Sequence, residues 1–142
     1  MEITIKNLST KEEMLAAYPL VAQMYTKMSE EEFSAALDQM IKLNNYKMVA
    51  AFEGDKMVGV SGYWFAFMLY CRKYLQVSNL VVDKEIRSKG IGKQMMKFFE
   101  EKAKKEGCQK VVLDSYTENK KSHSLYFKGG YYIRGFHFIK DL

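Results

Sequence analysis

The chain has 142 residues, of which 48% are hydrophobic and 14% aromatic, and its formal net charge is +5 at pH 7. This length and composition fit one domain over residues 1–142 with an ordered core, and they exclude a disordered or fibrous chain. The positive charge favours an anionic partner without selecting one, because the basic residues are interleaved with glutamates and form no run of five or more.

Several classes of protein are disfavoured by the same features. The apolar stretches are too short to cross a bilayer, and we expect no leader peptide. Cys71 and Cys108 have no metal-binding spacing and no companion motif, so we expect reduced thiols and no metal. A basic stripe interleaved with aromatic residues is missing, so nucleic acid is not an expected partner. The prediction is a cytoplasmic protein without a membrane partner.

The first third of the chain predicts a strand followed by helices. Residues 2–8 alternate polar and apolar side chains, which is typical of a strand. Residues 9–13 hold two overlapping capping boxes that predict the start of a helix, and Pro19 should kink or interrupt this helix. Ser29 and Glu32 form another capping box. The helix that it opens has one apolar face, formed by Phe33, Ala36, Leu37, Met40 and Ile41.

The rest of the chain predicts strands first and then an alternation of helices and strands. Residues 46–52 and 57–67 are rich in β-branched and aromatic side chains and are joined by turn residues, which indicates a hairpin. A further apolar strand is predicted at 74–82. The last third of the chain predicts a helix at 91–106, a strand at 110–114, a helix at 119–128 and a strand at 131–139.

This order of elements predicts the fold class. It is an α/β domain with a mixed, mostly antiparallel sheet of six to seven strands and about four helices. Because a helix joins strands 74–82 and 110–114, these two strands should be parallel neighbours.

The segment between strand 74–82 and the helix after it has the pattern Arg-x-x-Gly-x-Gly, from Arg87 to Gly92. Small residues that open directly onto a helix leave backbone N–H groups unpaired, and the helix dipole adds partial positive charge. Lys89 and Lys93 add mobile charge beside the same loop. The pattern therefore predicts a pyrophosphate-binding loop. The alternative is an ordinary strand-to-helix turn with solvated charges.

A second pattern lies on the helix predicted at 119–128. Asn119, Ser122 and Tyr126 are spaced so that they share one helix face, and Gly130 and Tyr131 follow. This spacing resembles the Asn-x-x-Ala-x-x-x-Tyr-x-x-x-Gly-Phe segment of the GNAT family of N-acetyltransferases, with serine for alanine and tyrosine for phenylalanine. The Arg-x-x-Gly-x-Gly loop resembles that family's acyl-CoA-binding motif, and the order of elements agrees over nearly the whole chain.

The resemblance implies the activity and the cofactor. It implies an N-acetyltransferase that moves the acetyl group of acetyl-CoA to a primary amine of a small molecule or peptide, by direct attack in a ternary complex, and releases coenzyme A. It also implies which groups contact acetyl-CoA. The pantetheine arm would contact Leu80, Val81 and Val82. The pyrophosphate would contact Arg87 and the backbone of Ser88, Lys89, Gly90, Ile91, Gly92 and Lys93.

The helix at 119–128 would complete the site. The resemblance implies that Asn119 and Ser122 lie near the pantetheine and that Tyr126 protonates the departing thiolate. A phenolate and a thiolate have comparable basicity, so the phenol of tyrosine is a sensible general acid. The alternative for Tyr126 is a core aromatic residue.

The general base is less clearly marked. Many family members carry a glutamate on the strand before the loop, and strand 74–82 has no acidic residue. Asp114 is the best acidic candidate, ahead of Glu118, His123 and ordered water, although Asp114 could equally cap the loop that follows it. The missing glutamate leaves a non-catalytic acyl-CoA-sensing module as the alternative function. The aromatic and methionine-rich stretch 63–70 could line an acceptor pocket or a homodimer surface.

Overall fold

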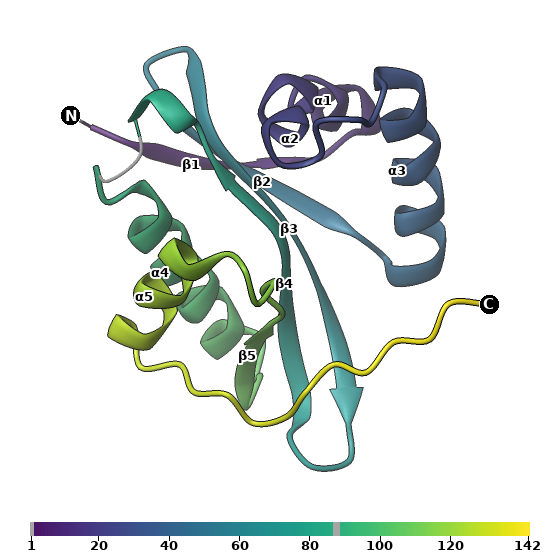
Figure 1. Ribbon diagram of the computed structural model, residues 1–142. Coiled ribbons are helices and arrows are strands. Elements are labelled where there is room, and N and C mark those ends of the chain that lie inside the picture. The colour runs from purple at the N-terminus through teal and green to yellow at the C-terminus, as the bar shows by residue number, and fades with distance from the viewer. Residues whose placement is uncertain (1, 87–88) are drawn as a thin grey trace.

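The computed structural model describes residues 2–86 and 89–142, which build a five-stranded sheet with the strand order β1-β2-β3-β4-β5 (Figure 1). The strands are β1 Thr4–Leu8, β2 Lys47–Glu53, β3 Lys56–Met68, β4 Arg72–Val82 and β5 Lys110–Leu113. Neighbouring strands from β1 to β4 are antiparallel, whereas β4 and β5 are parallel. The predicted hairpin and the predicted parallel pair are therefore confirmed.

The described helices begin in different ways, and two of them have a side-chain cap. They are α1 Lys11–Leu15, α2 Tyr18–Met24, α3 Glu30–Asn44, α4 Ile91–Lys105 and α5 Lys120–Lys128, with a short 3₁₀ turn at Lys84–Ile86. The capping box of Ser29 and Glu32 opens α3 as predicted, and Thr10 caps α1. Pro19 lies in the first turn of α2, where its missing N–H costs nothing, so the predicted interruption separates α1 from α2.

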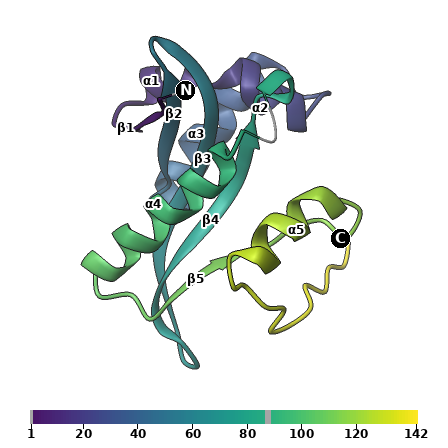
Figure 2. The same ribbon diagram turned by 90° about the vertical axis from the view of Figure 1, so that its left-hand side faces the viewer.

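Helices cover both faces of the sheet (Figures 1 and 2). On one face α1, α2 and α3 bury a cluster that includes Leu20 and Leu37. On the other face α4 buries Met95 and Phe99, and α5 packs at the margin with no fully buried residue. In the described part of the chain, no helix has the length and apolar character needed to span a membrane.

The prediction for the C-terminus is wrong. Residues 131–139 alternate like a strand, yet the described residues after α5 form no strand, so the sheet has five strands and not six or seven. A further strand would have to pair with the free edge of β5, which is only four residues long. Here Tyr131 donates a hydrogen bond to Glu100 of α4 at 2.8 Å, and Arg134 lies over the ring of Tyr70, so the chain is drawn past the short edge of β5. The described residues form five α-helices where about four were predicted, because α1 and α2 are separate.

Candidate active site

The second half of β4 departs from regular pairing. The register between β3 and β4 shifts between Val60 and Gly62, so Asn79 and Leu80 bulge opposite one residue of β3. Asn79 has a φ of 58°, in the left-handed region that asparagine tolerates better than most residues. A bulge bends a strand and redirects side chains, and here it turns the middle of β4 toward the pocket described below.

The pairing between the parallel strands β4 and β5 stops at Val77, just before the bulge. Tyr74–Val77 of β4 pairs with Lys110–Leu113, where β5 ends, while β4 continues to Val82. Among the described residues, none of β5 pairs with Ser78–Val81, so the sheet opens between the two strands. An extended ligand with amide groups could lie along this edge as an added strand would. The pantetheine arm of coenzyme A has this chemistry, so the opening fits it.

In the chain, α4 follows the C-terminal end of β4 and the short 3₁₀ turn (Figure 1). Gly90 precedes α4 with a φ of 80°, and no described side chain caps this helix, so the N–H groups of its first turn are open. A Cβ built on Gly90 would meet nothing within 4 Å, so there is space at this position. Lys89 and Lys93 are exposed beside it, and this chemistry fits a pyrophosphate. Arg87 and Ser88, part of the predicted loop, lie outside the described residues.

Gly92 brings α5 close to this loop, because a Cβ built on Gly92 would lie 3.1 Å from Leu125. On α5, Tyr126 is half-buried and packs edge-on against Tyr131, with ring centroids 6.2 Å apart. Burial raises the pKa of Tyr126, and its phenol forms no hydrogen bond with a described residue. Asn119 precedes α5 without capping it, and Ser122 is half-buried on the same helix. Helix α5 thus lies against the start of α4, and the roles of Asn119, Ser122 and Tyr126 stay predictions.

Ser115 is a polar residue that sequence reasoning missed. Its hydroxyl is buried and has no hydrogen-bond partner among the described residues, and it follows β5 by two positions. Buried hydroxyls are nearly always paired, so an unpaired one beside the opening suggests a partner that arrives with a ligand. No motif in the sequence marks this serine.

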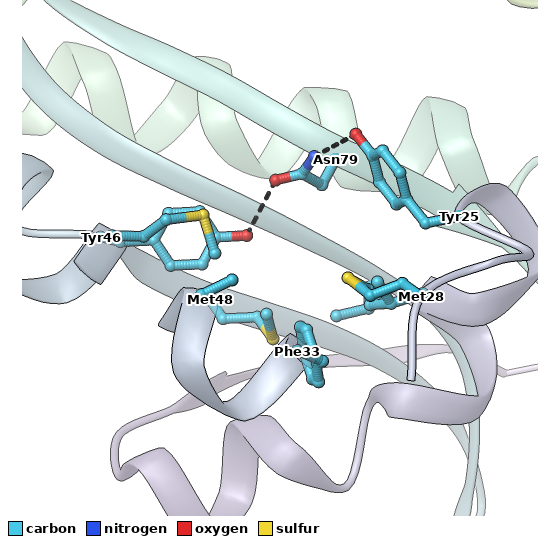
Figure 3. A pocket seen from close by; sticks show the side chains of 10 residues that line it. Tyr25, Met28, Phe33, Tyr46, Met48 and Asn79 are labelled. Carbon is cyan, nitrogen blue, oxygen red and sulfur yellow. Dashed lines mark hydrogen bonds between the residues drawn. The ribbon is translucent and has the colours of Figure 1, made fainter. Parts of the chain in front are cut away.

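A pocket lies on the other face of β4, below the bulge (Figure 3). Its volume is about 200 Å³, and it is walled by α2, α3 and strands β2 to β4. Three hydrogen bonds converge at its polar end. Tyr46 donates to the amide oxygen of Asn79 at 3.2 Å, Ser78 donates to the same oxygen at 3.0 Å, and the Asn79 amide donates to the Tyr25 phenol oxygen at 2.8 Å.

Both phenols at this end stay protonated at neutral pH. Burial raises the pKa of Tyr46. Burial also raises the pKa of Tyr25, and the neighbouring phenol of Tyr116 raises it further. Sequence reasoning missed these tyrosines as site residues, because they come from separate elements that only the fold brings together.

The acidic and basic candidates for the general base lie elsewhere. Asp114 has a side chain 69% exposed, and its carboxylate lies 4.0 Å from the ring of His137. One ring nitrogen of His123 lies 3.0 Å from the carbonyl of Tyr116, and Glu118 accepts a hydrogen bond from Thr117. None of these three candidates lines the pocket.

A mixed sheet whose parallel pair opens beside an uncapped helix N-terminus can hold an extended, phosphate-bearing ligand. The sequence model of the Acetyltransferase (GNAT) family matches residues 14–131, and the chain belongs to this family. The protein is therefore an acetyltransferase.

Individual relatives agree with this assignment. The chain is 27% identical over 141 residues to the uncharacterized N-acetyltransferase YhdJ of Bacillus subtilis, which covers 99% of each chain. It is 24% identical over 139 residues to the aminoalkylphosphonate N-acetyltransferase of Salmonella typhimurium, covering 94% of this chain and 88% of the other. The crystal structure of glucosamine-6-phosphate N-acetyltransferase from Arabidopsis thaliana has the same fold, with a TM-score of 0.73, 22% identity and 99% of each chain covered.

Proposed function

We propose that the protein transfers the acetyl group of acetyl-CoA to a primary amine of a small molecule or peptide, by direct attack in a ternary complex. The observation that carries this proposal is the opening between β4 and β5 beside the N-terminus of α4. When bound there, acetyl-CoA supplies an activated acetyl thioester. Direct transfer is favoured over a covalent relay because Cys71 is buried and burial raises the pKa of Cys108, which makes both poor nucleophiles.

The backbone on both sides of the opening binds the cofactor in this proposal. Leu80, Val81 and Val82 contact the pantetheine arm along the edge of β4. The loop from Lys89 to Lys93, together with Arg87 and Ser88, holds the pyrophosphate with backbone N–H groups and nearby positive charge. An N–H group near Val81 polarises the thioester carbonyl by donating a hydrogen bond to its oxygen.

The side chains of α5 and of the segment before it act on the reacting groups. Asn119 and Ser122 contact the pantetheine region, and Tyr126 donates its proton to the thiolate as the carbon–sulfur bond breaks. The raised pKa of Tyr126 keeps this proton in place through neutral and alkaline pH. Asp114 is the proposed base, and because its side chain is exposed it accepts the proton of the amine through water.

The test is release of coenzyme A thiol from acetyl-CoA by the whole protein, measured with a panel of primary amines. We expect amine-dependent release that far exceeds hydrolysis without amine. Double-reciprocal plots at several acetyl-CoA concentrations should intersect, as a ternary complex requires, whereas a covalent relay would give parallel lines. Tight binding of acetyl-CoA with no turnover on any amine would contradict the proposal and identify a non-catalytic sensing module.

A further inference from the structure

We infer that the acceptor is a primary amine carried on an uncharged, apolar body, and that this body occupies the pocket between α2, α3 and the sheet. The inference rests on the proposed function and names the substrate class of that enzyme. It follows from the wall of the pocket, from its polar end and from the position of that end beside the β4 bulge.

The wall of the pocket is apolar. Ten described residues line it, and none of their side chains carries a charge. The apolar ones are Val21, Met28, Phe33, Ala36, Met40, Met48 and Val60. Three of these are methionines, whose flexible side chains adapt to guests of different shape. A wall of this kind gains free energy from covering an alkyl or aryl group and offers a phosphate or a carboxylate no partner.

The polar end of the pocket is suited to an amine. Asn79 donates to the Tyr25 oxygen, and the Tyr25 proton is directed to the neighbouring Tyr116 phenol, which leaves one lone pair of the Tyr25 oxygen for a ligand (Figure 3). An amine N–H can therefore donate to Tyr25 while the nitrogen lone pair points elsewhere. Asn79 directly precedes Leu80 and Val81, where the thioester carbonyl is proposed to lie, so an amine held here is next to that carbon.

The polar end of the pocket depends on a glycine in β3, because Tyr46 passes this strand where Gly62 has no side chain. A Cβ on Gly62 would collide with the ring of Tyr46. The missing side chain lets the buried Tyr46 phenol pass β3 and reach Asn79. Asn79 is thus held by one hydrogen bond from Tyr46 and one from Ser78, which fixes the direction of its amide toward Tyr25.

The apolar wall also offers a reason why β4 can lack the glutamate that many family members carry on this strand. A primary amine is mostly protonated in neutral water, and only the neutral form attacks a thioester. Removal from water disfavours the charged form, so seating the amine in this pocket lowers its pKa and raises the neutral fraction. A strong base beside the amine is then less necessary, which agrees with the absence of titrating carboxylates and imidazoles among the described lining residues.

A charged acceptor would find little help beside the pocket. A second depression shares Tyr25 and Met28 with the pocket and is also lined by the exposed residues Lys27 and Glu32. Their charges are opposite, so this depression attracts neither phosphates nor cations strongly. Acceptors such as those named for the phosphonate and phosphosugar relatives are therefore excluded from this pocket.

The first test compares kcat/KM for 2-phenylethylamine with kcat/KM for glucosamine 6-phosphate and aminomethylphosphonate, using thiol release by the whole protein. We expect 2-phenylethylamine to be favoured by at least about 100-fold, because burying an unpaired phosphate is costly. Equal or better turnover of either phosphorus-containing amine would overturn the inference and leave the proposed function standing.

A second test does not depend on turnover. Ala36 lines the pocket, and the neighbouring Ala35 of α3 is exposed, so Ala36→Leu fills the pocket while Ala35→Leu is its matched control. Calorimetric titration with 2-phenylethylamine should give binding that Ala36→Leu weakens at least about tenfold and Ala35→Leu leaves unchanged. Acetyl-CoA affinity should be equal in all three proteins. No binding of the amine to the wild type, or equal binding to both variants, would overturn the inference even if no amine is acetylated.

Discussion

Tyr126 is the proposed general acid, and the described part of the protein does not engage its hydroxyl. Its phenol is half-buried on α5 and forms no hydrogen bond with a described residue, while its ring packs against Tyr131. Burial raises its pKa above the ordinary value of a phenol, so the proton stays in place at neutral pH and this group should cause no fall in kcat there.

We predict that Tyr126→Phe lowers kcat by about 100-fold, a typical contribution of a general acid. The ring is retained, so the packing against Tyr131 and the affinity for acetyl-CoA should stay close to wild type. Steady-state kinetics with saturating acetyl-CoA, together with calorimetric titration of the cofactor, give the two numbers. An unchanged kcat at the pH optimum would return Tyr126 to a purely structural role.

Asp114 lies at the end of β5, exposed and near His137. As a base that acts through water it should contribute modestly, so we predict that Asp114→Asn lowers kcat/KM for the amine by about tenfold at neutral pH. The loss should shrink as the pH is raised, because more of the amine is then neutral without help. His137→Asn is the matched control, since it removes the neighbour but keeps the carboxylate. A pH–rate profile of Asp114→Asn identical to that of the wild type would rule out this role.

At the scale of elements, features set by local chemistry were predictable from the sequence. The Ser29 capping box, the Pro19 interruption and the hairpin at 53–56 each depend on a few neighbouring residues, and each is confirmed. The overlapping boxes at 9–13 show the limit of such signals, because Thr10 and not Ser9 supplies the cap of α1. The two boxes have the same spacing one residue apart, so the local pattern does not indicate which of them caps the helix.

Features set by tertiary context were not predictable. The alternation of residues 131–139 is compatible with a strand, but the Tyr131–Glu100 hydrogen bond leads the chain away from β5. The bulge at Asn79 depends on a register shift between two strands, which hydrophobic periodicity does not report. The unpaired hydroxyl of Ser115 became visible only once its burial was known.

For the molecule as a whole, we propose that one face of the sheet binds the cofactor and the other binds the acceptor. The face with α4 and α5 and the opening between β4 and β5 suit the proposed cofactor, and a motif marks this region because a helix start that holds a pyrophosphate requires small residues at fixed positions. The face with α2 and α3 holds the pocket, whose residues come from five elements without any fixed spacing. The proposed cofactor site was therefore predictable from the sequence, and the proposed acceptor pocket was not.

The central claim is that the N-terminus of α4 binds acetyl-CoA. Calorimetric titration of acetyl-CoA into the wild type, Gly90→Asp and Gly107→Asp tests it most directly. Gly90 and Gly107 lie at opposite ends of α4, both with positive φ and with nothing within 4 Å of an added Cβ, so the two variants introduce the same charge and similar backbone strain.

We predict that Gly90→Asp weakens binding by at least about 100-fold, because its carboxylate would repel the pyrophosphate at close range. Gly107→Asp, at the far end of the helix, should bind like the wild type. Equal affinity of Gly90→Asp and the wild type for acetyl-CoA would contradict the claim.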